Sequence, residues 1–332
     1  MKYNPALDGL RAVAAFMVLA FHCQLPGSNG GWVGVNIFFV LSGFLITGLL
    51  VSERDRSGGI DLTRFYISRA LRLWPPLILM LVAYLLAAPL LFPASDAVSN
   101  VTLAGLYLSD YSIAYWRQPF DLIHTWSLAV EQHFYMIWPL VVLALARVDR
   151  ATAFRILLAA WLMATLWRMA DAALGMQFFH TFYRFDTNLS GLLLGSALAL
   201  SGWRSNALLW PGLALLVCAG SFTPFYSGWT VTIAPVAADA GAAMLLPALS
   251  GRAASALSVG WLPYLGQLSY SIYLWHYPIV VALRPEGGSL PLQSAVLVLV
   301  GSVALAAVSY EAIEKPLRVM RKRPPAPDLK TS

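Results

Sequence analysis

Charged residues are scarce in this chain. Asp, Glu, Lys and Arg make up 11% of its 332 residues, whereas 59% are hydrophobic and the mean hydropathy is +0.67. A soluble globular domain carries about 25% charged residues, so this composition excludes one and predicts an integral membrane protein. The net charge of +6 does not indicate nucleic-acid binding, because the basic residues gather in a few loops and in the C-terminal tail.

Cysteine is nearly absent as well. Cys23 and Cys218 lie in apolar runs far apart in the sequence, so we expect neither a disulfide framework nor a bound metal. The first apolar stretch contains Arg11 and has no small-residue cleavage site, so we expect a retained helix and not a signal peptide. No internal repeat, soluble domain or long linker is visible in the sequence.

Ten apolar stretches are long enough to cross a bilayer. Arginines are concentrated in the loops at 53–72 and 147–155, and the positive-inside rule places both loops in the cytoplasm. An even number of crossings must lie between these loops, so the weak apolar stretch at 97–112 is predicted to be re-entrant or interfacial. The ten stretches lie at 7–25, 33–52, 71–92, 126–147, 151–173, 184–202, 206–222, 229–250, 264–283 and 291–314.

These patterns predict an all-α integral membrane protein. We expect about ten transmembrane helices, one re-entrant or interfacial segment and both termini in the cytoplasm. A single transmembrane domain is predicted over residues 1–316. The tail at 317–332 is basic and contains several prolines, so it is predicted to be disordered.

The first helix carries two ionisable residues on one face. Arg11 and His22 are eleven residues apart, which on a helix is three turns plus about 20°, or roughly 16 Å along the axis. Ionisable side chains in a membrane helix usually face the interior of the bundle or a water-filled cavity. Arg11 alone could be an interfacial anchor and His22 a core histidine, but the two on one face favour a polar pathway.

The fourth predicted span contains a carboxylate near its outer end. Glu131 lies about two turns into this span, with His124 at the entrance and His133 close in sequence. A carboxylate at that depth is a candidate functional residue with a histidine partner. The topology places it in the same outer half as His22, and a carboxylate that orients an imidazole makes a general base. A buried structural pair is the alternative.

Two arginines lie at the cytoplasmic end of the third span. Arg69 and Arg72 are three residues apart, so on a helix they are neighbours. Paired guanidinium groups are suited to phosphate, although arginines also flank many spans as signals of orientation. At the same end of the bundle, Glu311, Glu314 and Lys315 are expected to form structural pairs with the basic loops.

Small and polar residues in the second span have two possible roles. Ser42 and Gly43 allow close approach of another helix, which is the more ordinary role of small residues in a membrane. Asn36, near the outer end of this span, is a polar group that needs a partner.

Two later pairs could line the same outer cavity. Arg184 and Asp186 could hold a polar ligand or could pair locally at the membrane interface. Tyr273 and His276 are three residues apart and share a helix face, where His276 either lines the cavity or lies at the interface.

Together these stretches resemble the acyltransferase 3 family of bacterial membrane O-acyltransferases. Each stretch is weak alone, but the set covers nearly the whole chain in the family's order. The matching pieces are Leu7–Arg11 with His22, Phe38–Phe44, Arg69–Arg72 with Pro75, Thr125–Glu131 through Phe134 and Tyr135, Arg184–Asp186, and Ser269–His276.

The resemblance implies a ten-helix core in the bacterial cytoplasmic membrane, in contact with membrane lipid. It implies that acyl-CoA, usually acetyl-CoA, is the cytoplasmic donor and that the acceptor is a hydroxyl of an exported glycan or lipid-linked saccharide. The family's active residues correspond here to a catalytic pair, His22 and Glu131, and to donor-binding arginines. The donor-binding residues are then Arg11, Arg69 and Arg72, and the candidate substrate-binding residues are Asn36, Ser42, Trp126, Arg184, Asp186, Tyr273 and His276.

The chain departs from the family's pattern at two places. The family often has Asp where this chain has Asn36, so a charge there cannot be essential. It often has a second Glu and a Gln after the first Glu, where this chain has Gln132 and His133. Some relatives carry an additional soluble esterase-like domain, which is not expected here.

The expected mechanism follows from the resemblance and the pattern together. Arg69 and Arg72 would hold the phosphates of coenzyme A, and the thioester arm would run along the Arg11 face to His22. His22 would take the proton of the acceptor hydroxyl while Glu131 orients its imidazole. A proton-coupled transporter or flippase is the rival class, since intramembrane ionisable residues suit transport equally well. A scaffold that only binds is a third possibility, and it predicts no turnover.

Overall fold

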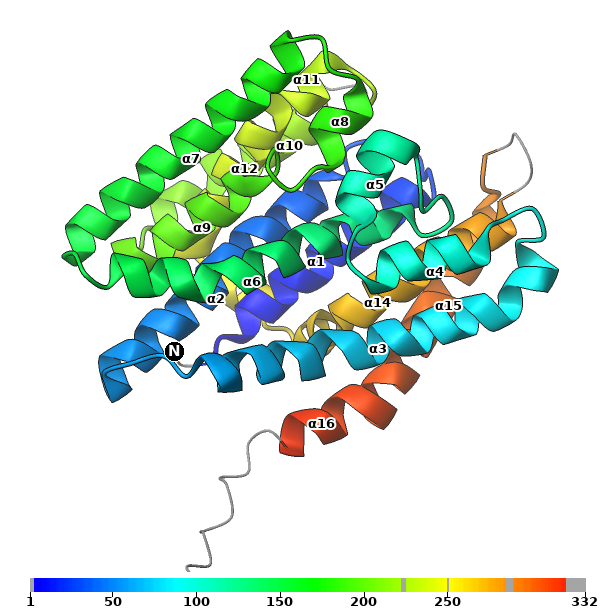
Figure 1. Ribbon diagram of the computed structural model, residues 1–332, viewed down its shortest axis with the longest axis horizontal. Helices are drawn as coiled ribbons and strands as arrows, with labels where there is room; N and C mark the ends of the chain where they lie inside the picture. The colour runs from blue at the N-terminus through cyan, green and yellow to red at the C-terminus, as the bar shows by residue number, and fades with distance from the viewer. Residues whose placement is uncertain (1–2, 222–224, 250, 285–288, 321–332) are drawn as a thin grey trace, which may run out of the picture.

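The computed structural model describes residues 3–221, 225–249, 251–284 and 289–320, and these residues form helices joined by short connections, with no strand among them (Figure 1). This part of the chain confirms the predicted all-α class. Most of the predicted tail, residues 321–332, lies outside the described residues. The elements are α1 (Pro5–His22), α2 (Val33–Ser57), α3 (Leu62–Leu91), α4 (Ala97–Gly105), α5 (Ser109–Trp116), η1 (Ile123–Thr125), α6 (Trp126–Leu145), α7 (Arg150–Ala173), α8 (Phe178–Tyr183), α9 (Leu189–Ser201), η2 (Asn206–Leu208), α10 (Leu209–Ser221), α11 (Gly228–Val231), α12 (Ile233–Ala248), α13 (Gly251–Leu257), α14 (Trp261–Leu283), α15 (Leu292–Ser309), η3 (Tyr310–Glu314) and α16 (Lys315–Met320).

Six helical segments of the described chain are long and apolar enough to cross a membrane. Three shorter apolar helices, at 189–201, 206–221 and 233–248, lie among them. Every one of the ten predicted stretches falls on a helix, while the count of ten crossings and the cytoplasmic placement of the termini stay predictions. The six segments are Pro5–His22, Val33–Ser57, Leu62–Leu91, Ile123–Leu145, Arg150–Ala173 and Leu292–Leu317.

The weak stretch at 97–112 forms two short helices instead of one long one. α4 has 9 residues and α5 has 8, so each is only about 12–14 Å long, against roughly 30 Å of hydrocarbon in a bilayer. Neither helix can cross alone. α4 packs on α3, and α5 packs on α6 and α8.

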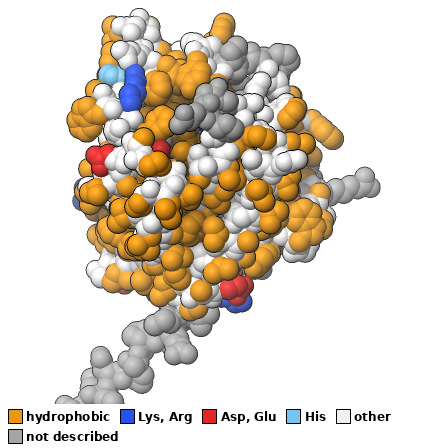
Figure 2. All heavy atoms as spheres, turned by 90° about the vertical axis from the view of Figure 1, so that its right-hand side faces the viewer, with side chains coloured by type: hydrophobic (Ala, Val, Ile, Leu, Met, Phe, Trp, Pro, Cys, Tyr) orange, Lys and Arg blue, Asp and Glu red, His pale blue; other side chains and the backbone are white. Residues whose placement is uncertain are grey.

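The surface of the bundle carries many apolar side chains. Along α3, Leu86 is 75% exposed and Leu90 is 85% exposed, and Val308 on α15 is 64% exposed. Hydrophobic side chains are likewise spread over the face in Figure 2, where charged ones are few. Exposed apolar area of this extent is unfavourable in water but suits a lipid environment, as expected of a multi-pass membrane protein.

α1 and α2 lie at the centre of the bundle (Figure 1). α1 packs on α14, which in turn contacts α15 and α3, while α2 packs on α9 and α12. α1 begins with a cap, because the Asn4 side chain accepts a hydrogen bond of 3.1 Å from the Ala6 amide and Pro5 occupies the first turn. This central position means that side chains of α1 can meet groups from both halves of the bundle.

Glycines let these helices approach closely. A Cβ on Gly43 would lie 2.0 Å from the Leu192 carbonyl oxygen, and one on Gly195 would lie 2.0 Å from the Val40 carbonyl oxygen. The prediction that Gly43 permits a close helix contact is therefore confirmed, and the contact is between α2 and α9.

Candidate active site

A polar cavity lies at the end of the bundle where α1 begins. Its volume is about 240 Å³, and it contains two guanidinium groups, from Arg11 and Arg72, and two carboxyl groups, from Asp8 and Glu314. The Asp8 carboxylate accepts a hydrogen bond of 2.8 Å from the Tyr3 hydroxyl. The complete lining is Tyr3, Asp8, Arg11, Leu45, Leu71, Arg72, Gly266, Gln267, Tyr270, Tyr310 and Glu314. We call this the basal cavity.

A second, smaller cavity adjoins the basal cavity. Its volume is about 30 Å³, enough for about one water molecule, and Arg11 and Tyr270 line both spaces. Glu131 enters it from α6, and Tyr273 from α14. The other lining residues are Val35, Phe38, Phe39, Ser127, Leu128 and Ser269. We call this the middle cavity.

Arg11 points into the protein and not toward lipid. Its Nε donates a hydrogen bond of 3.3 Å to the Ser269 hydroxyl, and its guanidinium carbon is 6.0 Å from the centre of the Phe38 ring. Because the side chain lines both cavities, Arg11 lies in the interior of the bundle and is not an interfacial anchor.

Glu131 has hydroxyl neighbours. The Ser42 hydroxyl donates to Glu131 Oε1, and the Tyr135 hydroxyl donates to Ser42 Oγ at 3.0 Å. Arg11 and Arg72 also interact with this carboxylate electrostatically. Ser42 was predicted as a substrate-binding residue, and the structure places it against the candidate catalytic acid.

A cluster of three imidazoles lies near the opposite end of α1. His22 Nδ1 is 2.8 Å from His276 Nε2, and the His124 ring lies edge-on to His276 with the ring centres 5.4 Å apart. Next to this cluster, the Tyr273 hydroxyl donates to the His124 carbonyl oxygen at 2.8 Å and lies 2.7 Å from the Ser127 hydroxyl. Tyr273 therefore connects the imidazole cluster to the middle cavity.

A proline explains how one of these histidines is held. Pro278 has no amide hydrogen, so the carbonyl of Leu274, four residues earlier in α14, lacks its usual helical partner. His124 Nε2 lies 3.2 Å from that carbonyl oxygen and can donate to it. The Pro278 position thus fixes the ring of a histidine that is 1% exposed.

The predicted pairing of Glu131 with His22 is wrong in this structure. Glu131 shares the middle cavity with Arg11, and Arg11 is roughly 16 Å from His22 along α1, so the carboxylate does not reach the imidazole. His133 does not replace it, because residues two apart on a helix point in nearly opposite directions. His133 Nδ1 instead lies 3.2 Å from Asp110 Oδ2 on α5.

The two arginines of α3 have different surroundings. Arg72, for which donor binding stays a prediction, lines the basal cavity. Arg69 is 9% exposed and does not line it; its guanidinium carbon lies 5.9 Å from the centre of the Phe65 ring. Both arginines act electrostatically on Tyr135, so the positive charge of the pair is directed toward the Glu131 region.

Two predicted substrate-binding residues contact other side chains of the core. The Asn36 amide donates to Asp239 Oδ1 at 2.8 Å, and Asp239 also accepts from the Ser190 hydroxyl at 2.6 Å. Trp126 packs edge-on against Tyr183, with the ring centres 5.2 Å apart. Neither Asn36 nor Trp126 lines the basal or middle cavity.

Arg184 and Asp186 pair locally, which was the alternative to ligand binding. Arg184 donates to Asp171 Oδ1 at 3.0 Å and to Asp186 Oδ2 at 2.6 Å. Burial alone would raise the pKa of Asp186, but the hydrogen bonds from Arg184 and Trp167 and the charge of Arg184 outweigh it and hold this pKa below its usual value. With these bonds made inside the protein, neither side chain is directed into the basal or middle cavity.

Two residues that line the basal cavity, Glu314 in η3 and Tyr270 in α14, were not predicted to do so from the sequence. Glu314 was expected in a structural pair, but its Oε1 accepts from Ser271 at 2.5 Å and its side chain lines the basal cavity. It ends the π-helical turn η3, a type of turn that often occurs at functional sites. Its neighbours Glu311 and Lys315 do form a local ion pair, at 2.5 Å. Tyr270 on α14 lines both cavities, and its one signal in the sequence was its place in the Ser269–His276 stretch.

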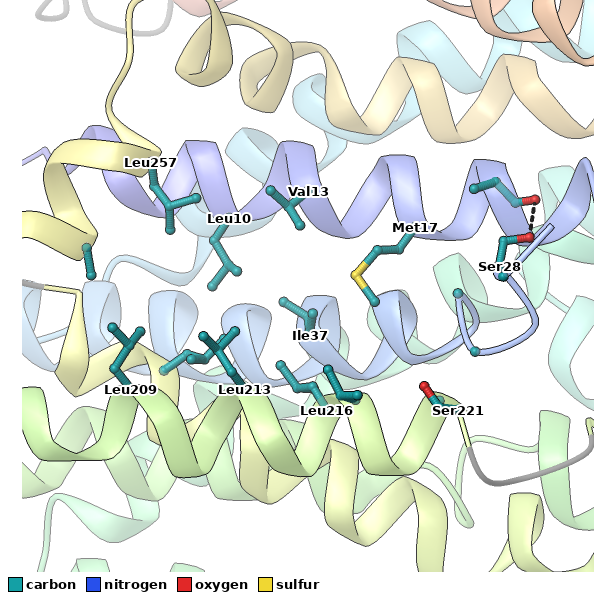
Figure 3. Close-up of a pocket in the computed structure, with 18 of the residues that line it drawn as sticks. Leu10, Val13, Met17, Ser28, Ile37, Leu209, Leu213, Leu216, Ser221 and Leu257 are labelled. Atoms are coloured by element: carbon teal, nitrogen blue, oxygen red, sulfur yellow. Dashed lines mark hydrogen bonds between the residues drawn. The ribbon is translucent and has the colours of Figure 1, made fainter. Parts of the chain in front are cut away.

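A larger cavity, of about 610 Å³, differs from the basal and middle cavities in having an almost entirely apolar lining. It lies between α1, α2, α10, α12 and α13, with Leu10 and Met17 on one side and Leu213 and Leu216 on the other (Figure 3). Its lining consists of apolar residues, glycines and two serines, Ser28 and Ser221, with no acid, base or histidine. It therefore offers no group for proton transfer.

Fold and site together define a multi-pass membrane protein with a buried arginine, carboxylate and imidazole system along its central helix. The chain belongs to the acyltransferase family whose sequence model is described as "Acyltransferase domain", which matches residues 4–311. The predicted family is thus confirmed.

Several named relatives are similar over almost all of this chain. It is 30% identical to the peptidoglycan O-acetyltransferase OatA of Listeria monocytogenes, with 96% of this chain and 56% of the relative covered. It is 33% identical to the putative peptidoglycan O-acetyltransferase YrhL of Bacillus subtilis (96% and 55%), and 30% identical to the O-acetyltransferase OatA of Staphylococcus aureus (96% and 57%). The chain spans about half the length of these relatives. No solved structure matches it.

Proposed function

We propose that the protein is a membrane O-acetyltransferase that moves an acetyl group from cytoplasmic acyl-CoA to a hydroxyl of an exported or lipid-linked glycan. The observation that carries the proposal is the series of polar groups along α1: Arg72 and Arg11 at one end, Glu131 and Tyr273 midway, and His22 with His276 at the other. The relatives are named for peptidoglycan O-acetylation, which makes peptidoglycan the first acceptor to test.

The basal cavity would receive the donor. Arg11 and Arg72 supply the cationic groups for phosphate, and the two carboxylates accept hydrogen bonds from hydroxyls, Asp8 from Tyr3 and Glu314 from Ser271. At about 240 Å³ the cavity is smaller than the roughly 300–1,000 Å³ of pockets that enclose drug-sized ligands. We therefore place there only the phosphates nearest the flexible arm, with the nucleotide outside.

The flexible arm would continue through the middle cavity. This cavity has room for about one water molecule, so the side chains of Phe38 and Tyr273 have to move apart to admit the arm. Beside this cavity the Ser42 hydroxyl donates to the carboxylate of Glu131, and Arg11 acts on that carboxylate electrostatically. In this proposal Glu131 lies beside the arm and does not orient His22.

The chemical step would take place at His22. The acceptor hydroxyl loses its proton to His22, its oxygen bonds to the acetyl carbon, and the carbon–sulfur bond of the thioester breaks. The proton then passes from the imidazolium to the departing thiolate, which leaves as coenzyme A and returns the base to its starting state.

The test uses purified protein in detergent, acetyl-CoA and a soluble peptidoglycan fragment as acceptor. We expect free coenzyme A and acetylated fragment to form in equal amounts, and His22→Ala to lose at least 10²-fold in kcat. The control is His180→Ala, which removes a histidine of α8 that lies against Tyr115 and outside both cavities. Normal turnover by the His22 variant would overturn the proposal. Turnover without a membrane gradient would exclude a transporter.

A further inference from the structure

His22 makes its side-chain hydrogen bond to another histidine. Its Nδ1 lies 2.8 Å from Nε2 of His276, and the two rings are stacked with their centres 5.0 Å apart. The other nitrogen of His276, Nδ1, lies 2.6 Å from the backbone carbonyl oxygen of Tyr273, one turn earlier in α14. The Tyr273 carbonyl, the His276 imidazole and the His22 imidazole are thus hydrogen-bonded in series.

The backbone carbonyl of Tyr273 determines which imidazole nitrogens of His276 and His22 carry a hydrogen. A carbonyl oxygen can only accept, so His276 Nδ1 must carry a hydrogen and donate it to Tyr273. With both imidazoles neutral, His276 Nε2 then has a lone pair and accepts, which requires the hydrogen of His22 to be on Nδ1. The nitrogen left with a lone pair on His22 is Nε2, which has no hydrogen-bond partner among the described residues.

From this geometry we infer that His276 is a positioning residue for the transfer reaction, which sets the tautomer of His22 so that Nε2 is the proton-accepting atom. The inference rests on the proposed function, since it concerns the base assigned there. It gives His276 the role that the sequence had suggested for Glu131, the third group that holds an imidazole in its reactive tautomer.

Neighbouring groups keep this arrangement in place. The His124 ring lies edge-on to His276, and its Nε2 lies 3.2 Å from the Leu274 carbonyl oxygen, so this nitrogen is already engaged. Arg284 Nη2 donates to the His22 carbonyl oxygen at 2.7 Å, and the Tyr277 ring lies edge-on to the His22 imidazole at 4.8 Å. The titratable groups around His22 are thus His276, His124, Tyr277 and Arg284, and no carboxylate among the described residues is in hydrogen-bond contact with it.

Two substitutions at one position test the inference. His276→Phe keeps a planar ring but removes the acceptor, so we expect kcat to fall about 10²-fold while KM for acetyl-CoA stays within about twofold. His276→Gln retains an amide oxygen that can accept from His22 Nδ1, so we expect it to regain about tenfold over the Phe variant. His180→Gln, in α8, is the matched control and should leave kcat unchanged.

A spectroscopic readout separates tautomer control from a purely structural role. The chain has five histidines, few enough to assign each imidazole ¹⁵N signal by single substitutions in histidine-labelled protein. We expect His22 Nδ1 to carry the hydrogen in the wild type and in His276→Gln, and to lose this preference in His276→Phe. Wild-type kcat and an unchanged His22 signal in His276→Phe, with His22→Ala inactive, would overturn the inference and leave the proposed function standing. An active His22→Ala would overturn both.

Discussion

Replacing Gly266 with alanine is expected to push α14 away from α1. An added Cβ would lie 1.8 Å from the Asp8 carbonyl oxygen, whereas an ordinary contact begins at 3.4 Å, so the two backbones must separate by about 1.6 Å. The neighbour is backbone and cannot rotate aside. Overpacking of this kind costs about 1–3 kcal/mol of folding free energy.

The same shift is expected to lower activity more than stability. Gly266 lines the basal cavity beside Arg11, and Arg11 reaches Ser269 on α14 through a bond that is already 3.3 Å long. A separation of 1.6 Å breaks that bond and moves the guanidinium relative to the donor, and misplacement by about 1 Å can reduce a rate about 10²-fold.

The assay compares thermal unfolding in detergent with kcat for acetyl-CoA turnover. The control is Gly301→Ala on α15, where the added Cβ meets only Ile279 at 3.6 Å, an ordinary contact. We expect the control to match or exceed the wild type in stability, since alanine favours a helix over glycine by about 1 kcal/mol. Wild-type Tm and kcat in Gly266→Ala would refute the close α1–α14 contact and its link to the site.

Two further predictions concern charged groups. Arg72→Gln removes a cation from the basal cavity, so it should raise KM for acetyl-CoA about tenfold and leave KM for the acceptor unchanged. The control is Arg54→Gln, which removes a surface ion pair with Asp55 and should change neither KM. An unaltered KM for acetyl-CoA in Arg72→Gln would refute the phosphate role. Asp186→Asn should lower Tm at neutral pH, because the bonds with Arg184 depress the pKa of Asp186. The stabilisation by this carboxylate is present above its ordinary pKa of 3.8 and is lost as pH falls through the depressed folded-state pKa. The difference in Tm between the wild type and Asp186→Asn should therefore narrow below about pH 4, and a wider difference would contradict the reasoning.

The helices could be predicted from the sequence because a membrane span needs only a long apolar stretch. All ten predicted stretches fall on helices, and the stretch at 97–112 forms two helices too short to cross. Arg11 could also be placed in the interior, since an arginine within an apolar helix has few favourable positions elsewhere.

The contacts between helices could not be predicted in the same way. Topology placed His22 and Glu131 in one half of the membrane, but it does not give the rotation of each helix about its axis or the depth of each side chain. A difference in depth of a few helical turns is enough to turn a hydrogen-bonded pair into two distinct sites. Glu131 meets Ser42 instead, and His22 meets His276, which lies 254 residues away in the chain. That last pairing depends on how α14 packs against α1, and no local pattern encodes it.

We propose that this one protein passes an acetyl group from one side of the membrane to the other along α1. The most direct measurement uses proteoliposomes with acetyl-CoA sealed inside and the peptidoglycan fragment only outside, followed by mass spectrometry of the external fragment. The predicted result is acetylated fragment outside, lost in His22→Ala and retained in His180→Ala. Product that forms only when donor and acceptor are on the same side would contradict transfer along this route.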